Sequence, residues 1–524
     1  MATLGASTPT KIQINAERWV LLLIAITLAG RVLLAATLGL GIDESYTVAT
    51  SRTFVLSTYD HPPMAWWMAG ATRRLFGSEA ALAVRVPFIL LFALTTWLMF
   101  ALTRILFGSR AGLFAALTLN LAPVLAWTTG TFVLPDGPLL AALLAGAYCV
   151  ARVLFVPGSP AALWWLGAGA CGGLACLSKL HGGFLFAGTA LFLLTTPSKR
   201  RWMLTPWPYL GTAVACLLFL PVIVWNVQHD WVSFAFQSRR AHVVNFEILA
   251  PLNVLAGHAV FILPWLWVPL VVSLVRALIC GPQDERGWLV TCLAIGPIVV
   301  FTLVAVSGNT VLYHWAAPGY LFAFALLGRD LAGMSMARAR GVWIWLMSTA
   351  ASLTVLLAAV LALAKLPWPP MPFAAGHSLT YPLIETLPWG ELKIELAQRG
   401  LLTQSNHFVA ATRWHEAGRI DIALEGQLPV RCLCNDARGY GFIHRNAEHA
   451  GADALIVGRN LSKNKIETAL AACFREIHQL SPVSLHQGGA PLVELQLFLG
   501  RHFTPSDNGP ACDRDGSIDA SRRR

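Results

Sequence analysis

Residues 19–46 read WVLLLIAITLAGRVLLAATLGLGIDESY, an apolar run that ends in an acidic pair. The run from Trp19 to Leu40 is long enough to cross a hydrocarbon core of ~30 Å as a helix. Asp43 and Glu44 follow it directly, so we expect their carboxylates at the membrane surface. An acidic pair in that position suggests chemistry on a molecule that the membrane holds.

The composition indicates a multi-span membrane protein. Of the 524 residues, 56% are hydrophobic and 12% are charged, and the mean hydropathy is +0.60, more apolar surface than a soluble domain can bury. The formal net charge of +11 comes mostly from basic residues in short loops, which the positive-inside rule explains. We therefore expect membrane lipids and no nucleic acid as partners. The ten cysteines are scattered without the spacing of a metal site.

Eleven apolar runs are candidate membrane spans, the first of them an uncleaved signal anchor. They are residues 19–40, 82–103, 111–127, 136–156, 162–178, 182–196, 205–225, 251–279, 288–306, 311–328 and 341–366. If residues 1–18 are cytoplasmic, basic residues fall inside at every second loop, as the charge rule expects. These basic residues are Arg104, Arg110, Arg152, Lys199, Arg200, Arg201, Arg276, Arg286, Arg329, Arg338 and Arg340.

The same loop parity places the unusual polar residues together on the opposite, extracytoplasmic side. They are Asp43, Glu44, Asp60, His61, Asp136, Lys179, His181, His229 and Asp230. Two outer loops depart from the charge rule, one with Arg52, Arg73, Arg74 and Arg85 and one with Arg239 and Arg240. These arginines are either snorkelling interfacial anchors or ligands for an anion, and both interpretations stay open.

The composition changes after Leu366, where a proline-rich linker follows and no further membrane-length run appears. With an odd number of spans, residues 367–503 lie outside, and their alternating pattern predicts a small α/β domain. We expect helices near 391–398, 414–424 and 462–480 and strands at 407–410, 429–434, 454–457 and 492–499. In an oxidising periplasm, either Cys432 or Cys434 is a candidate partner for Cys473. Residues 504–524 have the composition of a disordered tail.

Six motifs carry a family resemblance. They are GIDESY (41–46), YDHPPMAW (59–66), LPDGPL (134–139), GLACLSKL (173–180), PVIVWNVQHDWVSF (221–234) and HWAAP (314–318). As an ordered set along residues 15–365 they resemble GT-C glycosyltransferases of the protein O-mannosyltransferase type. The resemblance is strongest to the bacterial branch that contains the lipid A aminoarabinose transferase and the lipopolysaccharide galacturonosyltransferases. The outer α/β domain is less similar to that branch.

The resemblance implies a fold and an activity. The expected fold is a polytopic α-helical GT-C domain, residues 19–366, with an extracytoplasmic α/β domain after it. The implied reaction moves a sugar, with inversion, from a polyprenyl-phosphate donor to lipid A, lipopolysaccharide core, another glycan or a protein. The implied location is the periplasmic face of the cell inner membrane, and we expect a monomer.

The resemblance also assigns the three catalytic candidates. The family's acidic pair falls on Asp43 and Glu44, and a positioned Asp43 carboxylate suits a general base that takes the acceptor's proton. The alternative is that Asp43 stabilises a helix N-terminus after Gly41. Asp136 is implied as a second active-site carboxylate, although an N-cap also explains it.

The remaining candidates would bind the donor phosphate or the sugar. Lys179 would neutralise the leaving phosphate, unless it only snorkels or forms an ion pair. Asp60 and His61 precede two prolines, so they suit a phosphate contact, a metal ligand or an Asx turn. Arg239 and Arg240 are weaker phosphate candidates, and Tyr313 and His314 either line the donor cavity or end a helix. The need for a divalent cation is undecided, since no spacing has the look of a closed metal site.

Two other functional classes are less consistent with the sequence. A polyprenyl-lipid flippase or solute transporter would need polar residues deep in several spans and an internal repeat, whereas the polar residues here gather at one face. A noncatalytic scaffold would leave the acidic first loop without a role.

Overall fold

The computed structural model describes residues 11–239, 243, 245–365, 385–403, 406–443, 446–487 and 489–505. The chain divides into two compact units. The first unit comprises residues 1–33, 86–223 and 237–355, and the second comprises residues 34–85, 224–236 and 356–524. The predicted linker at 367–372 and nearly all of the predicted tail lie outside the described residues.

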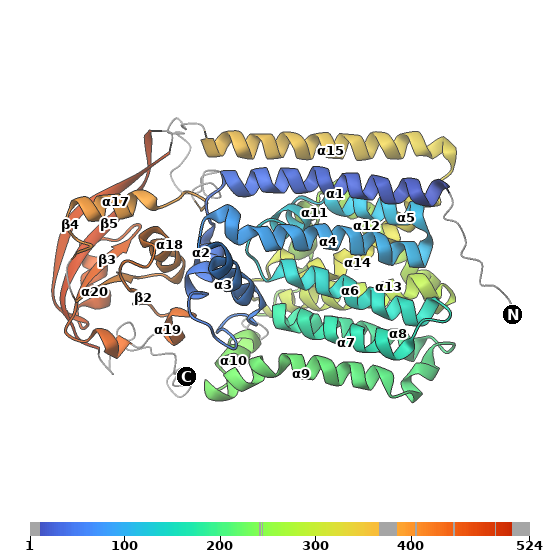
Figure 1. Cartoon of the computed structure of the whole chain (residues 1–524), viewed down its shortest axis with the longest axis horizontal. Coiled ribbons are helices and arrows are strands. Elements are labelled where there is room, and N and C mark those ends of the chain that lie inside the picture. The colour runs from blue at the N-terminus through green and yellow to red at the C-terminus, as the bar shows by residue number, and fades with distance from the viewer. Residues whose placement is uncertain are drawn as a thin grey trace. The chain divides into compact units, whose positions relative to one another are not determined.

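The first unit is a helical bundle whose long helices run side by side with nearly parallel axes (Figure 1). Its helices are α1 Lys11–Thr37, α4 Ala81–Phe107, α5 Ser109–Asn120, α6 Asp136–Phe155, α7 Ala161–Ser178, α8 Gly183–Thr195, α9 Trp207–Gln228, α11 Ala250–Ile262, α12 Pro264–Cys280, α13 Glu285–Leu303, α14 Ala317–Ala332 and α15 Met336–Lys365. Short turns connect them: η1 Pro123–Thr128, η2 Leu180–Gly182, η3 Arg200–Leu204, η4 Gly281–Gln283, η5 Val304–Ser307 and η6 Tyr313–Ala316.

Eight helices among the described residues are long and apolar enough to cross a membrane, so the protein is a multi-span membrane protein, as predicted. The three other expected runs form helices that are shorter than a span. Run 111–127 becomes α5 and the π-helical η1, run 182–196 becomes α8, and run 311–328 becomes α14. Run 251–279 is broken into α11 and α12 at Leu263, whose φ of 89° cannot continue a helix before Pro264.

Glycine sets how closely two helices of the bundle approach. A Cβ on Gly169 of α7 would lie 1.9 Å from the carbonyl oxygen of Gly211 in α9. Only a residue without a side chain fits there, as at the small-residue contacts of membrane helices.

The second unit contains two short helices from the first loop and the C-terminal α/β domain. The helices are α2 Ile42–Thr50, α3 Met64–Phe76, α17 Gly390–Gln398, α18 Trp414–Leu424, α19 Tyr440–Ile443 and α20 Lys463–Leu470, with η7 Asn446–His449. The helix α10, Val232–Arg239, lies where the chain passes from this unit back to the first. The strands are β1 His407–Ala411, β2 Val430–Cys432, β3 Asp453–Gly458, β4 Phe474–Gln487 and β5 Ala490–Phe503.

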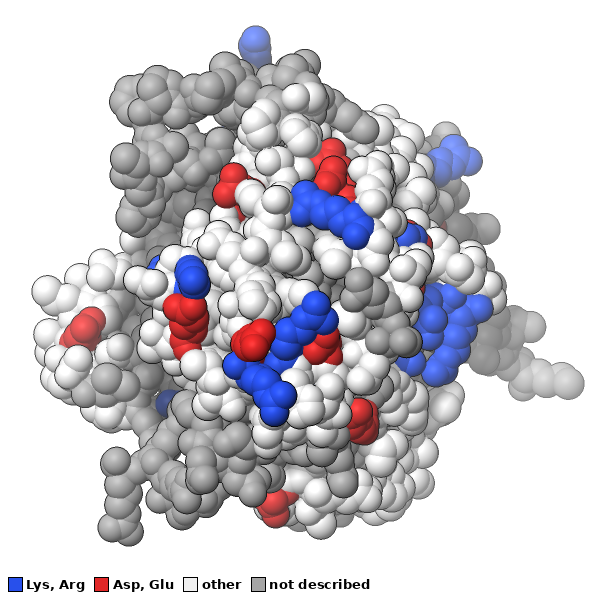
Figure 2. All heavy atoms as spheres, turned by 90° about the vertical axis from the view of Figure 1, so that its left-hand side faces the viewer, with Lys and Arg blue, Asp and Glu red and all other residues white. Residues whose placement is uncertain are grey.

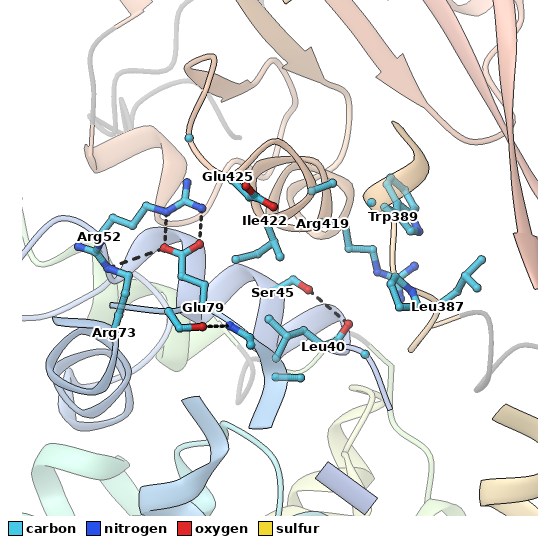
Figure 3. Close-up of a pocket in the computed structure, with 18 of the residues that line it drawn as sticks. Leu40, Ser45, Arg52, Arg73, Glu79, Leu387, Trp389, Arg419, Ile422 and Glu425 are labelled. Carbon is cyan, nitrogen blue, oxygen red and sulfur yellow. Dashed lines mark hydrogen bonds and ion pairs between the residues drawn. The ribbon is translucent and has the colours of Figure 1, made fainter. Parts of the chain in front are cut away.

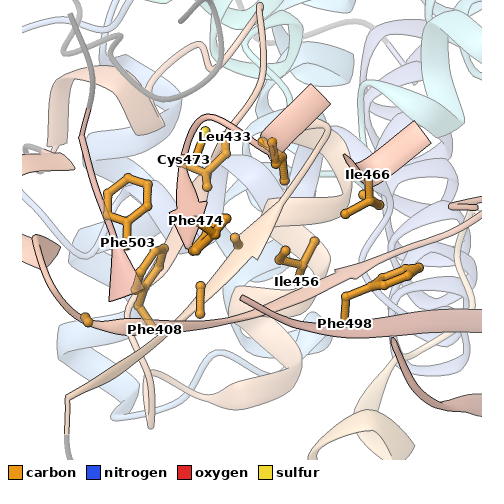
Figure 4. Packing of buried hydrophobic residues seen from close by; sticks show 12 residues of the cluster. Phe408, Leu433, Ile456, Ile466, Cys473, Phe474, Phe498 and Phe503 are labelled. Atoms are coloured by element: carbon orange, nitrogen blue, oxygen red, sulfur yellow. The ribbon is translucent and has the colours of Figure 1, made fainter. Parts of the chain in front are cut away.

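These strands form one mixed sheet in the order β2-β1-β3-β5-β4. The strands β2, β1 and β3 are parallel, with Val409 opposite Val430 and Leu455. The strands β3, β5 and β4 are antiparallel, with Leu497 opposite Val457 and Leu480. A cluster that includes Phe408, Ile456, Phe498 and Phe503 forms the core on one face of the sheet (Figure 4). The predicted α/β domain is therefore present.

One predicted element of this domain is wrong. The expected helix at 462–480 ends at Leu470, and residues 474–487 form the edge strand β4. Phe474, Ile477 and Leu480 recur at every third residue, a spacing typical of a helix. These residues nevertheless lie in a strand that pairs with β5 in one constant register from Phe474 to Leu480, so the spacing does not indicate a helix here.

The predicted disulfide is also different. Cys432 is bonded to Cys434, two residues away at the end of β2, and neither of them pairs with Cys473. The bridge closes the chain on itself just before the segment that carries Arg438. Sequence alone could not give this connectivity.

Charged residues on the face shown in Figure 2 are interspersed. Most lysine and arginine side chains there lie beside an aspartate or glutamate, apart from a basic group near the right-hand edge.

Candidate active site

Asp43 lies in the first turn of α2 and is exposed. The helix begins here because Gly41 is extended and its N–H donates to the Glu44 carboxylate, 2.9 Å away. The two acidic residues of the first turn also suit the positive end of the helix dipole. Asp43 therefore lies at a helix N-terminus, as the alternative interpretation of the sequence expected. Its side chain is exposed, so a substrate can reach it.

Glu44 is buried and makes a two-pronged ion pair with Arg85. The distances are 2.8 Å from Arg85 Nε to Glu44 Oε1 and 2.6 Å from Arg85 Nη2 to Oε2. Arg85 is fully buried and also donates to the carbonyls of Leu38 and Gly39, at 2.7 Å each. Glu44 therefore fixes the start of α2, and Arg85 is neither a surface anchor nor a free anion ligand.

Asp60 lies in a buried network that sequence analysis only partly anticipated. Its carboxylate accepts from the Tyr46 hydroxyl at 3.2 Å and from Arg438 Nη1 at 3.2 Å. The Tyr46 oxygen in turn accepts from the Gly439 N–H at 2.8 Å. Burial, followed by the charge of Asp60, raises the pKa of Tyr46 well above its ordinary value, so Tyr46 stays neutral and donates to Asp60.

Arg438 is the residue of this network that the sequence did not reveal. Its guanidinium lies 3.8 Å from the centre of the Trp414 ring, a cation–π contact. Its φ of 45° is unusual for a residue other than glycine, and such strain often marks a functional position. Arg438 also lies within electrostatic range of Asp43. Its only sequence signal is an arginine before Gly439-Tyr440, which is too weak to single it out.

His61 is half-buried beside Asp60. Its backbone carbonyl accepts from the Thr58 hydroxyl at 2.7 Å, which shapes the turn. A role for its imidazole stays a prediction.

A second ion-pair group fixes α2 against the C-terminal domain within the same unit. Arg52 donates to both oxygens of Glu79, at 2.7 and 2.6 Å, and is ion-paired with Asp421 of α18. Tyr440 also donates to Asp421, at 3.2 Å. Burial raises the pKa of Asp421, against the opposing charge of Arg52. Arg52 is thus a structural residue.

The first unit brings together candidates from three different loops. Lys179 Nζ lies 3.0 and 3.2 Å from the two carboxylate oxygens of Asp136, and both side chains are buried. Asp136 begins α6, and Lys179 lies between α7 and η2. His314 and His181 lie within electrostatic range of Asp136. The partner of Lys179 in this structure is therefore a carboxylate, one of the alternatives left open above.

The last candidates do not join this group. Tyr313 is 47% exposed and its ring fits against Gly257, where a Cβ would approach within 2.1 Å. Arg239 ends α10 and is exposed. Arg240 lies outside the described residues. Their phosphate or donor-cavity roles stay predictions.

Comparisons with known proteins bear on the fold. Residues 60–225 match the family model described as dolichyl-phosphate-mannose-protein mannosyltransferase. Most of the chain is similar in structure to ArnT from Cupriavidus metallidurans bound to undecaprenyl phosphate. That match covers 92% of this chain and 98% of ArnT, with a TM-score of 0.66 and 16% identity. The apo structure of the same ArnT matches over the same shares, with a TM-score of 0.63 and 14% identity.

The protein has the GT-C glycosyltransferase fold. A sequence relative is the lipid A galacturonosyltransferase RgtD from Rhizobium johnstonii, 24% identical over 297 residues. These residues are 53% of this GT-C chain and 58% of RgtD, so the chain spans a little over half the length of this relative.

A cavity of about 800 Å³ in the second unit of this GT-C protein is separate from Asp43 (Figure 3). Arg52, Arg73 and Glu79 line one side, and Trp389 and Arg419 line the other. Among the residues of α2, Ser45 lines the cavity and Asp43 does not. Residues two apart on a helix point to different faces, so this cavity is not where the proposed base lies.

The GT-C chain has no group of three or more His, Cys, Asp or Glu suited to a metal ion within its described ranges.

Proposed function

We propose that this protein is an inverting glycosyltransferase that moves a sugar from a polyprenyl-phosphate donor to a cell-envelope acceptor. The GT-C fold supports the reaction class. Undecaprenyl phosphate in the similar ArnT structure supports the donor class. The name of RgtD, a lipid A galacturonosyltransferase, makes a lipid A-type acceptor the first candidate. Lipopolysaccharide core, another glycan and a protein are the others.

The proposal rests on the exposure of the Asp43 carboxylate. In the first turn of α2, Glu44 is buried in an ion pair while its neighbour Asp43 is exposed. The helix start is therefore rigid, and one carboxylate remains accessible for proton transfer. Such a fixed carboxylate beside the reacting hydroxyl is what general-base catalysis needs.

The acceptor hydroxyl oxygen attacks the anomeric carbon of the donor, and its proton passes to the Asp43 carboxylate. The bond between the anomeric carbon and the phosphate oxygen breaks, and its electron pair leaves with the polyprenyl phosphate. Because the attack comes from the face opposite the leaving group, the anomeric configuration inverts.

Lys179 and Asp136 would bind the donor. An ammonium group has three N–H donors, and those of Lys179 are partly directed at the two oxygens of Asp136. Asp136 would thus orient Lys179, which retains donor capacity for a phosphate oxygen. Fixed donors of this kind stabilise a developing negative charge.

We also infer that the C-terminal domain is periplasmic. The helix α2, with Asp43, and the helix α18 of that domain lie in one compact unit, joined by the ion pair between Arg52 and Asp421. The disulfide between Cys432 and Cys434 suits an oxidising compartment.

The test compares Asp43→Asn with Glu467→Gln, which neutralises an exposed carboxylate elsewhere in the same unit. Envelope lipids and glycans are measured by mass spectrometry in cells that lack the gene and in cells complemented with each variant. We expect a sugar mass that is restored by wild type and Glu467→Gln. Asp43→Asn should slow transfer by ~10²–10⁴-fold, the usual contribution of general-base catalysis. Near-normal transfer by correctly inserted Asp43→Asn would refute the assignment of the base.

A further inference from the structure

A second polar cavity lies in the first unit, where several helices end. Its volume is about 650 Å³. It is lined by residues 153–157 at the end of α6, by Lys199 and Arg201 after α8, and by residues 283–286 at the start of α13. The positive-inside rule assigns all three segments to the cytoplasmic side. This cavity thus belongs to the membrane face opposite the one predicted for Asp136 and Lys179.

The carboxylates of this cavity are already engaged. Asp284 accepts from the Gly287 N–H at 3.1 Å, as the cap of α13, and forms an ion pair with Arg329 at 2.7 Å. Glu285 forms an ion pair with Lys199 at 3.4 Å. Neither carboxylate is directed at the arginines of the cavity.

Arg201 and Arg286 have no ion pair with a carboxylate in the described part of the chain. Arg286 donates from Nη1 to the Leu106 carbonyl at 3.0 Å, which fixes the guanidinium but does not neutralise it. The cavity therefore holds two guanidinium charges that the protein does not compensate.

One aromatic ring brings two of the cations together. Lys199 Nζ lies 5.2 Å from the centre of the Phe155 ring, and the Arg286 guanidinium carbon lies 5.8 Å from it. Lys199 is already paired with Glu285, so the charge left for an anion to neutralise is that of the arginines. Leu154, Val156 and Pro157 add an apolar wall next to the charged groups.

We propose that this cavity binds the phosphate headgroup of an anionic lipid from the cytoplasmic leaflet. Arginine matches phosphate oxygens in a two-pronged geometry, and the apolar wall suits the glycerol and upper acyl carbons. Basic pockets between membrane helices on the cytoplasmic side bind such headgroups in general. The inference does not depend on the proposed transferase activity.

The experiment is a titration of the full-length protein with phosphatidylglycerol, read by native mass spectrometry in detergent. Phosphatidylcholine is the neutral comparison lipid, and inorganic phosphate is added as a competitor. The double variant Arg201→Gln with Arg286→Gln removes the two uncompensated charges. The control is Arg200→Gln, because Arg200 is an exposed neighbour that does not line the cavity and bonds to the Leu194 carbonyl.

We expect saturable binding of phosphatidylglycerol that the double variant weakens by roughly 25-fold, about fivefold for each arginine near an anionic headgroup. The control variant should stay within about twofold of wild type. Equal binding of phosphatidylcholine, or equal weakening by Arg200→Gln, would overturn the proposal. Complete displacement by millimolar inorganic phosphate would also overturn it, since the site would then serve a soluble anion. Both arginines are exposed, so the variants should fold, which size-exclusion chromatography checks.

Discussion

Asp60 and Arg438 lie 378 positions apart in the chain, and their side chains are 3.2 Å apart. The contact joins the loop after the first span to the segment after the Cys432–Cys434 bridge. Asp60 is buried, and its pairing with Arg438 and Tyr46 explains why a charge is tolerated there. Among the carboxylates of the first outer loop, Glu44 and Asp60 are buried and Asp43 is exposed.

Arg438→Gln should destabilise the second unit because it removes a cation that pairs with the buried Asp60 carboxylate. The expected loss is about 3 kcal/mol, typical of removing one partner of a buried ion pair. Adding Asp60→Asn should recover part of it, since the unpaired charge is then gone. Thermal unfolding of the purified protein measures both effects.

The control for this cycle is Arg501→Gln, which breaks an ion pair between Asp453 and an arginine side chain that is 49% exposed. Exposed pairs contribute about 1 kcal/mol or less, so its melting temperature should stay close to wild type. If Arg438→Gln and Arg501→Gln lower the melting temperature by equally small amounts, the ion pair between Arg438 and Asp60 does not stabilise the network.

At the scale of elements, hydrophobic periodicity predicted most of the fold. It found the eight long helices and placed α18 at its observed bounds, because these segments have strong and uninterrupted patterns. It missed α2 and α3, since each is short and its apolar face is completed by the C-terminal domain or the first loop. It misassigned β4, whose apolar residues recur at every third position.

For the candidate site, the motif series singled out Asp43, Asp136 and Lys179. The structure pairs Lys179 with Asp136 and exposes Asp43, and their roles stay predictions. The motif series could not find Arg438 or Arg85 as ion-pair partners, since each pairing depends on tertiary packing between distant segments.

Gly418→Ala should separate α2 from α18 although alanine favours a helix. A Cβ at Gly418 would lie 2.7 Å from the backbone nitrogen of Tyr46, so the two helices must move apart. Overpacking of this kind costs about 1–3 kcal/mol, and it would displace the helix that carries Asp43. The control is Gly390→Ala at the start of α17, where a Cβ meets nothing within 4 Å. Gly418→Ala should therefore unfold at a lower temperature and transfer sugar more slowly than Gly390→Ala. If Gly418→Ala is as stable and as active as the control, α2 does not pack closely on α18.

For the whole molecule, each membrane face has its own group of charges. Asp136, Lys179 and His314 come from different outer loops and gather at one place in the first unit. Lys199 and Arg201 come from one inner loop and Arg286 from another, and all three line one cavity. This separation agrees with the predicted alternation of the loops, whereas the orientation itself rests on the positive-inside rule.

Reporter fusions test that orientation directly. Alkaline phosphatase folds to an active enzyme only in the periplasm, and green fluorescent protein exported there in unfolded form stays dark. We expect a fusion after residue 505 to give phosphatase activity without fluorescence, because the domain that packs on α2 must share the side of Asp43. A fusion after Ser198 should give the reverse, because Lys199 to Arg201 follow the positive-inside rule. If the same reporter is active at both positions, the predicted alternation of the loops is wrong. Fluorescence of the fusion after residue 505 would place Asp43 on the side away from a periplasmic acceptor.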